Sequence, residues 1–186
     1  HEDQNGSCPT INDLRRTQMM GAILMMSIGM PLLHAGQDFL FSKRGVQNTY
    51  QRGDLNALFY ERRLEFASTS EYFRGWIEFR KSELGRLTRH FSRASDRFFE
   101  FLRPNEGNAL VCIYNADRSR GPERLLFAVN PDLSPRLCFL GEWKGEWTQL
   151  ADRDRFWGLD PAPLRNDLSG EIALPPLGCG LWVSSD

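Results

Sequence analysis

The sequence predicts two fold classes in succession, an α/β part in residues 1–90 and an all-β part in residues 91–186. In the first part, two helical patterns flank a short apolar run, which is the arrangement of a buried parallel strand between helices. In the second part, short apolar or alternating runs are separated by Asn, Asp, Gly and Pro, which is typical of an antiparallel β-sandwich.

The bulk composition is that of an ordinary globular protein. The chain has 186 residues, of which 41% are hydrophobic and 25% charged, and its formal net charge is -1. This length fits one domain or two small ones. Positive and negative residues are mixed along the chain, so nothing indicates a nucleic-acid partner.

The cysteines and histidines show no metal-binding spacing. The cysteines form no CxxC pair and the histidines are scattered, so we expect neither a metal site nor a cofactor. Cys112 and Cys138 lie in strand-like apolar runs and are expected to be buried free thiols. A bridge between these two stays open as an alternative, and so does the cellular compartment. The cysteines are Cys8, Cys112, Cys138 and Cys179.

The first helix is predicted from about Thr10 to about Ser27. Thr10 fits an N-cap, and Asp13, three residues later, completes a variant of the capping box. The second half of this segment, MMGAILMM, is apolar on every face. Such a helix is expected to be buried on all sides.

The stretch from residue 17 to residue 37 contains no Asp, Glu, Lys or Arg. Its length alone would permit a membrane span. Gly29 and Pro31 interrupt the helix, however, and no second run of this kind follows, so we expect no membrane partner. We expect instead a buried helix, a turn at residues 28–30 and a buried parallel strand over residues 31–35.

The second helix is predicted to begin at a capping box formed by Ser68 and Glu71. Its apolar residues then follow a helical stripe, with Tyr72 and Trp76 among them, and core packing is the expected role of these aromatic side chains. Gly85 is expected at the carboxyl end as the residue that follows the helix.

Short runs rich in β-forming residues predict the strands of the second part. Trp143 and Trp147 would share one face of a regular strand, and together with Trp157 they suggest an exposed platform on which sugar rings stack. Core burial of at least one of them is the alternative. The runs are FFEFL, ALVCIYNA, RLLFAVNP, RLCFLGEW, EWTQLA, GEIALPPLG and GLWVSSD.

The segment from Gly29 to Asn56 carries the candidate site. A short apolar run there opens into a loop rich in hydrogen-bonding side chains. Barrel-type α/β proteins build the mouth of a ligand site in this way. The polar side chains of interest are Gln37, Asp38, Asn48, Tyr50, Asp54 and Asn56.

This segment resembles a known family. GMPLLHAGQDF matches the pattern G-x-P-x-x-x-x-G-[QE]-[ED] at the eighth strand of the α-amylase superfamily of glycoside hydrolases. The longer run HAGQDFLFSKRGVQNTYQRGDLNAL looks most like the pullulanase and debranching branch, and YFRGWIEFRKS is similar to the helix that follows. The tail IALPPLGCGLWV resembles the last strand of the family's C-terminal sandwich, so the resemblance covers nearly the whole chain.

The resemblance implies a (β/α)8, or TIM, barrel followed by an antiparallel β-sandwich. Residues 1–90 would supply the end of the seventh strand through the eighth helix, and residues 91–186 the sandwich. A complete barrel needs about 250 residues. The chain begins at His1, which we interpret as a cut into a longer protein.

The resemblance also implies the roles of individual residues. His1 matches a substrate-binding histidine that an aspartate follows in the family. Here Glu2 follows it and Asp3 comes one later, so Asp3 (or Glu2) is the candidate transition-state stabiliser, with a polar chain end as the alternative. Gln37 and Asp38 would line the substrate cleft, or bind the loop backbone.

The run from residue 48 to residue 56 would contact glucose units next to the cleaved bond, through Asn48, Tyr50, Asp54 and Asn56. Phe59 stands where the family usually has an aspartate, which removes a charge from the site.

Two functions are therefore expected as alternatives. The first is the C-terminal portion of an α-glucan-active glycoside hydrolase that cleaves α-1,6 bonds, with α-1,4 bonds left open. In the family the nucleophile and the acid/base lie on the fourth and fifth strands, so this chain is expected to be inactive alone. The second is a non-catalytic α-glucan-binding or docking module, or an inactive fragment. The expected partners are pullulan, glycogen or starch, and the missing N-terminal barrel segment.

Overall fold

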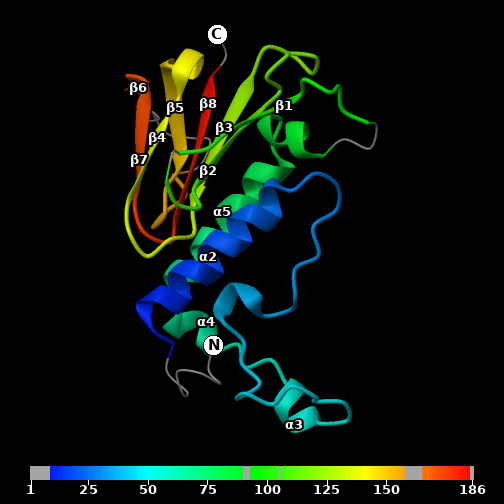
Figure 1. Ribbon diagram of the computed structural model, residues 1–186. Coiled ribbons are helices and arrows are strands. Elements are labelled where there is room, and N and C mark those ends of the chain that lie inside the picture. Colours follow the sequence, from blue (N-terminus) through cyan, green and yellow to red (C-terminus); the bar gives the residue numbers. More distant parts are fainter. Residues whose placement is uncertain (1–8, 90–92, 105, 158–164, 185–186) are drawn as a thin grey trace.

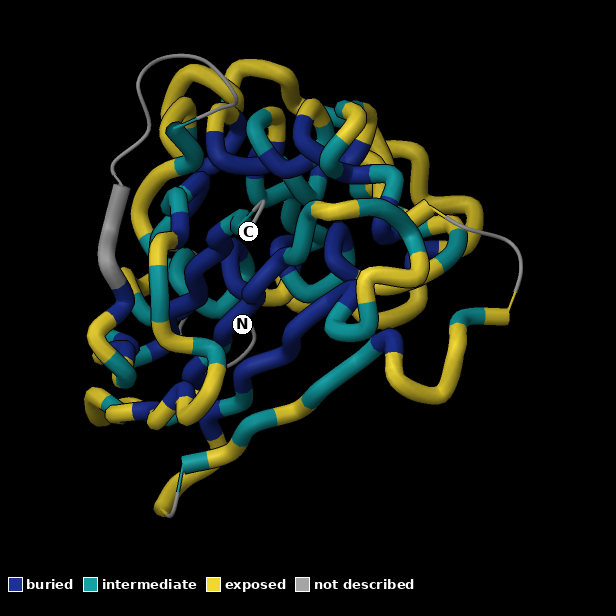
Figure 2. The backbone as a smooth tube through the Cα atoms, turned by 90° about the horizontal axis from the view of Figure 1, so that it is seen from above, coloured by how far each residue is buried: buried dark blue, intermediate teal, exposed yellow. Residues whose placement is uncertain are grey.

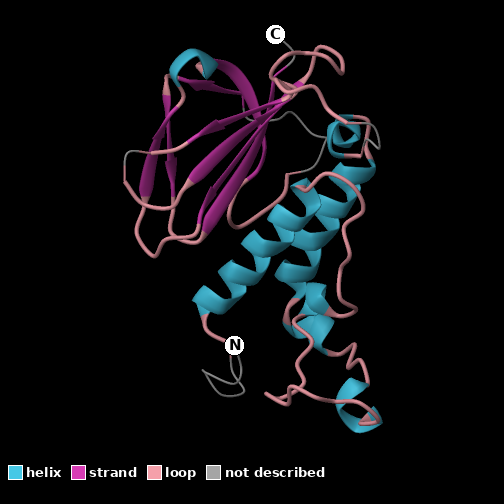
Figure 3. Cartoon of the chain, turned by 45° about the vertical axis from the view of Figure 1, so that its right-hand side comes forward, coloured by secondary structure: helices cyan, strands magenta, loops and turns pink. Residues whose placement is uncertain are grey.

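The computed structural model describes residues 9–89, 93–104, 106–157 and 165–184. Two long helices lie side by side against one face of a sheet, and a smaller sheet lies on the other side of it (Figures 1 and 3). The long helices are α2 (Ile11–Met26) and α5 (Ala67–Lys81). Both long helices precede the strands in the described chain, and the two helices occur where the sequence predicts helices.

The start of α2 confirms the predicted capping box. The Asp13 N–H donates to the Thr10 hydroxyl at 3.3 Å, and the Thr10 N–H donates to the Asp13 carboxylate at 2.9 Å. Both bonds satisfy N–H groups that a helix leaves without intrahelical partners. The helix ends at Met26, with Ser27 as its C-cap.

The capping box predicted at Ser68 and Glu71 is wrong. Helix α5 begins at Ala67, Phe66 precedes it, and no side chain caps its first turn. The short helix α4 (Arg62–Glu65) leads directly into it, and the Ser70 N–H donates to the Phe66 carbonyl at 3.1 Å. Helix α5 therefore follows α4 through Phe66, and Ser68 lies within its first turn instead of capping it.

At its other end, α5 stops at Lys81 and a 3-10 helix, η2 (Leu84–Thr88), follows. Gly85 lies within η2 and not at the predicted position directly after the helix. A Cβ atom there would lie 2.2 Å from the Phe79 carbonyl oxygen, so the close approach of the two segments requires glycine.

The strand predicted over residues 31–35 is not formed. This stretch has no regular secondary structure, and Met30 and Leu32 are 88% and 90% exposed. A parallel strand needs hydrogen-bonding neighbours beside it. All strands in the described part of the chain lie between Phe99 and Ser184, and none of them pairs with this stretch.

Six strands form an antiparallel sheet in the order β1-β2-β3-β8-β5-β6, and β4 pairs with β7 in a second, two-stranded sheet. The predicted runs all lie on or beside strands, and β6 was not predicted because its sequence, RNDL, lacks apolar alternation. The strands are β1 (Phe99–Leu102), β2 (Leu110–Tyr114), β3 (Arg124–Asn130), β4 (Arg136–Phe139), β5 (Gly145–Ala151), β6 (Arg165–Leu168), β7 (Glu171–Leu174) and β8 (Gly178–Ser184).

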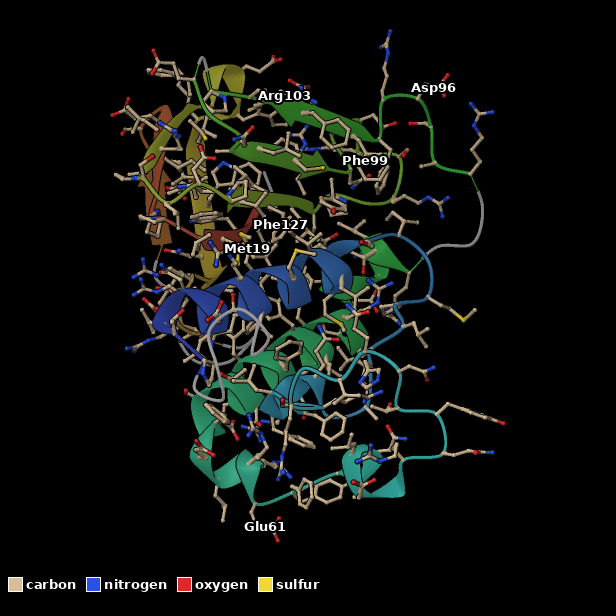
Figure 4. The ribbon with its side chains drawn as sticks, turned by 60° about the horizontal axis from the view of Figure 1, so that its bottom comes forward. Met19, Glu61, Asp96, Phe99, Arg103 and Phe127 are labelled. Atoms are coloured by element: carbon tan, nitrogen blue, oxygen red, sulfur yellow. The ribbon has the colours of Figure 1, made fainter. Side chains whose placement is uncertain are left out.

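The centre of the large sheet is buried on both faces. Leu125 and Phe127 point to a cluster shared with α2 and α5, whereas Leu126 and Ala128 point to a cluster shared with β4 and β7. Successive residues of a strand face opposite sides, so a strand covered twice must be apolar throughout. Figure 4 shows Met19 of α2 and Phe127 of β3 at the interface of helix and sheet, and Figure 2 shows buried segments in the interior with exposed segments around them.

The cysteines follow the same division. Cys112 faces the helices, whereas Cys138, on β4 of the two-stranded sheet, faces the cluster between the two sheets; both are free, as is Cys179. The bridge that stayed open from the sequence is therefore absent. Within the described ranges, no helix is both long and apolar enough to cross a membrane.

Candidate functional site

The candidate site lies in the long connection between α2 and α5, residues 27–66. This connection runs away from the sheet and carries only short helices (Figures 1 and 3). Most of its residues are exposed or half-buried. Its helices are η1 (Gln37–Phe39), α3 (Gly53–Asn56) and α4.

Gly36 turns the chain at the start of the loop. Its φ of 83° lies in the left-handed region, and its carbonyl accepts from the Phe41 N–H at 2.8 Å. A Cβ atom at this position would lie 2.6 Å from the Phe41 Cβ. The sequence pattern that ends in glycine therefore has a local physical reason, which is the tight turn that presents Gln37 and Asp38.

Gln37 and Asp38 are both half-buried in η1. Gln37 lines a cleft, described below. The Asp38 backbone carbonyl accepts a hydrogen bond from the Ser70 hydroxyl at 3.1 Å, which ties η1 to the start of α5. The two residues are thus adjacent, as predicted, and one of them faces a cavity.

The side chains of residues 48–56 mostly bind their own loop. The Asn48 side chain accepts from the Tyr50 N–H at 3.1 Å, and the Asn56 amide donates to the Thr49 carbonyl at 2.8 Å. Such bonds fix turns in the absence of sheet or helix. The Tyr50 side chain, in contrast, points outward and is 81% exposed.

Asp54 forms a two-point ion pair with Arg52. The guanidinium donates through Nε at 2.9 Å and through Nη2 at 2.7 Å to the two carboxylate oxygens. These hydrogen bonds from Arg52 lower the pKa of Asp54 below its ordinary value. The carboxylate therefore stays ionised and acts as an acceptor, not as a proton donor near neutral pH.

A cleft of about 440 Å³ lies between the first half of α2 and the loop that follows η1. Its volume falls in the range of about 300–1,000 Å³ typical of small-molecule sites. Of the predicted residues it contains Gln37, while Asn48, Tyr50, Asp54 and Asn56 do not line it. The side chains that bring charge to it are Asp13, Arg16, Lys43 and Arg62.

Sequence reasoning missed most of this charged lining. Asp13 was assigned to the helix cap, and that is where its Oδ2 binds, at 2.7 Å from the Thr10 hydroxyl. Arg62 donates to the Leu40 carbonyl at 3.1 Å. Lys43 donates to the Thr49 hydroxyl at 3.0 Å. No pattern in the sequence pairs α2 with this loop, because the contact joins segments that are distant in the chain.

Asp13 supplies the one carboxylate among the described residues that line this cleft. Glycoside hydrolysis ordinarily uses two carboxyl groups, about 5–9.5 Å apart. The described lining can donate and accept hydrogen bonds to a polar ligand, but it does not contain such a pair. The predicted residues His1, Glu2 and Asp3 lie outside the described residues. Among the described residues, no cluster of His, Cys, Asp or Glu suits a metal ion.

Comparison with known proteins gives a consistent result. No family model matches the chain. This chain is 38% identical over 78 residues to the pullulanase of Bacillus subtilis (strain 168). The match covers 40% of this chain and 11% of that protein. The structure superposes on the pullulanase from Bacillus acidopullulyticus with a TM-score of 0.81 and 20% identity, over 97% of this chain and 22% of the other.

Pullulanases are homologues of this chain in sequence and in fold. This confirms the predicted resemblance. The pullulanase type I structure from Bacillus subtilis str. 168, complexed with maltose, matches with a TM-score of 0.81 and 21% identity, over 97% of this chain and 24% of the other. This chain therefore spans only part of these pullulanases, 11% of the curated protein and 22–24% of the two structures.

Proposed function

We propose that this chain is the C-terminal portion of an α-glucan-active glycoside hydrolase of the pullulanase type, which hydrolyses α-1,6-glucosidic bonds. The observation that carries the proposal is the match of 97% of this chain to 22–24% of two pullulanase structures. A match of nearly the whole chain to a small share of a larger enzyme is what a portion of such an enzyme gives.

In this proposal, residues 1–90 belong to the (β/α)8 barrel and residues 91–186 form the C-terminal antiparallel β-sandwich. Helices α2 and α5 would be the last two barrel helices. The exposed apolar side chains of Met30 and Leu32 support this arrangement, because strands supplied by preceding residues would cover them. The missing barrel segment is thus the proposed protein partner.

The proposed substrate is an α-glucan such as pullulan, glycogen or starch. Matching pullulanase structures are described as complexed with maltose and with maltotetraose. On this chain, Gln37, Asp38, Asn48, Tyr50, Asp54 and Asn56 are the proposed contacts, with His1 and Asp3 (or Glu2) at the amino end. The exposed Tyr50 ring offers an apolar face, and the ordered loop around it supports that ring.

A non-catalytic glucan-binding module is the second candidate. The single carboxylate among the described residues of the Gln37 cleft favours it for the isolated chain. Two assays on the purified chain separate the candidates from an unrelated function. We expect no release of reducing ends from pullulan, and retardation of the chain during electrophoresis in gels that contain pullulan.

The electrophoresis includes a Tyr50→Ala variant and a matched Phe139→Ala variant, in which an aromatic residue that is 58% exposed is removed from β4. Loss of retardation in the Tyr50 variant alone supports the glucan contact. Absence of retardation in the unmodified chain contradicts glucan binding by this portion. Hydrolysis of pullulan by the purified chain contradicts the proposal that the catalytic nucleophile and acid/base lie outside it.

A further inference from the structure

A second cleft lies between α5 and residues 152–157, which follow β5. Its volume is about 410 Å³. One wall is the polar face of α5, with Glu71, Arg74 and Glu78, and the other is the loop after β5, with Asp154 and Trp157. The two clefts share no lining residue, so a ligand in one does not occupy the other.

The loop wall of this second cleft is held in place by hydrogen bonds. The Asp152 carboxylate accepts from the N–H groups of Asp154 and Arg155, each at 2.8 Å. The backbone N–H of Trp157 donates to the Leu150 carbonyl at 2.9 Å, which brings the loop back to the end of β5. These bonds give residues 152–157 a defined conformation, which lowers the ordering cost of binding at this wall.

Two contacts fix the loop against the helix. The Tyr72 hydroxyl of α5 donates to the Asp152 carbonyl at 2.9 Å, and the Phe156 ring packs edge-on against Trp76 with centroids 5.2 Å apart. Gly75 permits this approach, since a Cβ atom there would lie 2.5 Å from the Phe156 Cβ. The floor and the walls of the cleft therefore form one rigid arrangement.

The charges in this cleft are mixed and largely paired. Arg74 forms an ion pair with Glu71 and lies 4.0 Å from Glu78, and Arg153 pairs with Asp154. Exposed pairs of this kind keep donors and acceptors available but leave little net charge for a strongly ionic ligand. The lining suits a neutral ligand with many hydroxyl groups.

Trp157 adds an apolar surface of a kind that the other described tryptophans do not offer. Trp76, Trp147 and Trp182 are buried, and Trp143 donates to Glu100 and lies under the Arg124 guanidinium. Trp157 is half-buried at the cleft, and within the described residues its side chain has no hydrogen bond or ring contact. An indole beside carboxylates and guanidinium groups is a surface that can stack on one face of a sugar ring and bind its hydroxyls.

We propose that the cleft between α5 and the Trp157 loop is a second carbohydrate site, which holds a segment of an α-glucan chain. The choice of an α-glucan over other sugars rests on the proposed function, whereas the choice of a neutral polyol rests on the cleft itself. A second site would hold a polymeric substrate to the protein while another segment of the polymer reaches the Gln37 cleft.

The test is a titration of the 186-residue chain with maltotetraose, followed by the NMR signals of the tryptophan indole N–H groups. The signal assigned to Trp157, by its absence from the Trp157→Ala variant, is expected to shift with saturation. In the Trp157→Ala variant, the affinity of this cleft for maltotetraose is expected to be at least about tenfold lower. Phe139→Ala is the matched control, because it removes an exposed aromatic residue from β4, outside both clefts.

A Glu78→Ala variant provides a second measurement should the Trp157 variant fold poorly, since Glu78 is an exposed helix residue. It is expected to weaken binding while the far-UV circular dichroism stays unchanged. An unshifted Trp157 signal at saturating maltotetraose overturns the second site. Should Tyr50→Ala then abolish the remaining binding, the proposed function stands without the second site. Absence of any binding contradicts both binding proposals, and pullulan hydrolysis by a chimera with the Bacillus subtilis pullulanase tests the hydrolase assignment separately.

Discussion

The Tyr72 hydroxyl of α5 lies 3.0 Å from the Cys179 thiol of β8, although 107 residues separate them. The same hydroxyl donates to the Asp152 carbonyl at 2.9 Å. Both groups are buried among residues of the cluster between helices and sheet. A polar contact inside this interface requires the helices and the sheet to pack in one register, so the two halves of the chain share a single core.

Replacement of Tyr72 by Phe is expected to lower the free energy of unfolding by about 1–3 kcal/mol, because the Asp152 carbonyl and the thiol lose their partner inside the core. Urea denaturation measures the change. Tyr50→Phe is the control, since that side chain is 81% exposed and its hydroxyl can bind water instead. Equal stability of both variants would show that the buried contact contributes nothing.

Arg80 is expected to be the most sensitive charged residue of α5. It is 6% exposed and donates to the carbonyls of Ser27 at 2.9 Å and Thr88 at 3.2 Å, and also to those of Met25 and Gly29. No carboxylate contacts it among the described residues. It instead satisfies carbonyls at the end of α2, where a cation is favoured by the helix dipole.

Replacement of Arg80 by Met is therefore expected to cost about 3–5 kcal/mol, since several buried carbonyls lose their donor together. Replacement by Lys is expected to recover only part of this, because an ammonium lacks the planar fork of donors. Arg74→Met, in an exposed ion pair of the same helix, is the control and should cost less than about 1 kcal/mol. A loss of similar size in both variants would contradict this role for Arg80.

Gly21 is expected to tolerate no side chain, although alanine favours helices. A Cβ atom there would lie 2.5 Å from the Phe73 Cζ, where α2 crosses α5. We expect Gly21→Ala to destabilise the fold by about 1–3 kcal/mol through overpacking, which exceeds the gain of about 1 kcal/mol in helix propensity. Combination with Phe73→Leu should restore part of the loss. A Gly21→Ala variant more stable than the unmodified chain would contradict this prediction, because it would mean that α2 and α5 can move apart without loss of stability.

The buried thiols predict how stability depends on alkaline pH. Burial raises the pKa of both Cys112 and Cys179 to about 12, whereas an unfolded cysteine titrates near 8.5. The folded state therefore binds more protons than the unfolded state between these values. The stability associated with these thiols is complete below about pH 8.5 and falls as the pH rises towards 12.

Denaturation curves measured from pH 7 to pH 11 test this dependence, with Cys179→Ala as the comparison. The slope of stability against pH is expected to be smaller in the variant, because one raised pKa is removed. Identical slopes would contradict the assignment to Cys179. In the native protein at pH 8, the described cysteines should also react with a thiol reagent only on unfolding.

Local signals in the sequence predicted the helices and most strands well. The Thr10 cap and the aromatic stripe of α5 depend on residues three or four apart, and both are present. The errors lie where distant segments decide the outcome. Ser68 is not a cap because α4 continues into α5, and none of the described strands pairs with the stretch at residues 31–35.

The tryptophans of the second half illustrate the same limit. Trp143 and Trp147 were expected to share a strand face, but Trp143 lies in η3 (Gly141–Trp143) and Trp147 is 4% exposed in the core. Trp157, in contrast, lines a cleft. Which aromatic residue stays accessible depends on the packing of two sheets and a helix, and no spacing in the sequence encodes it.

The most direct test of the hydrolase assignment is a chimera in which this chain replaces the structurally matching segment of the Bacillus subtilis pullulanase. We predict that the chimera releases reducing ends from pullulan, whereas the 186-residue chain alone releases none. A chimera that unfolds cooperatively and still binds maltose, but leaves pullulan intact, would contradict the account.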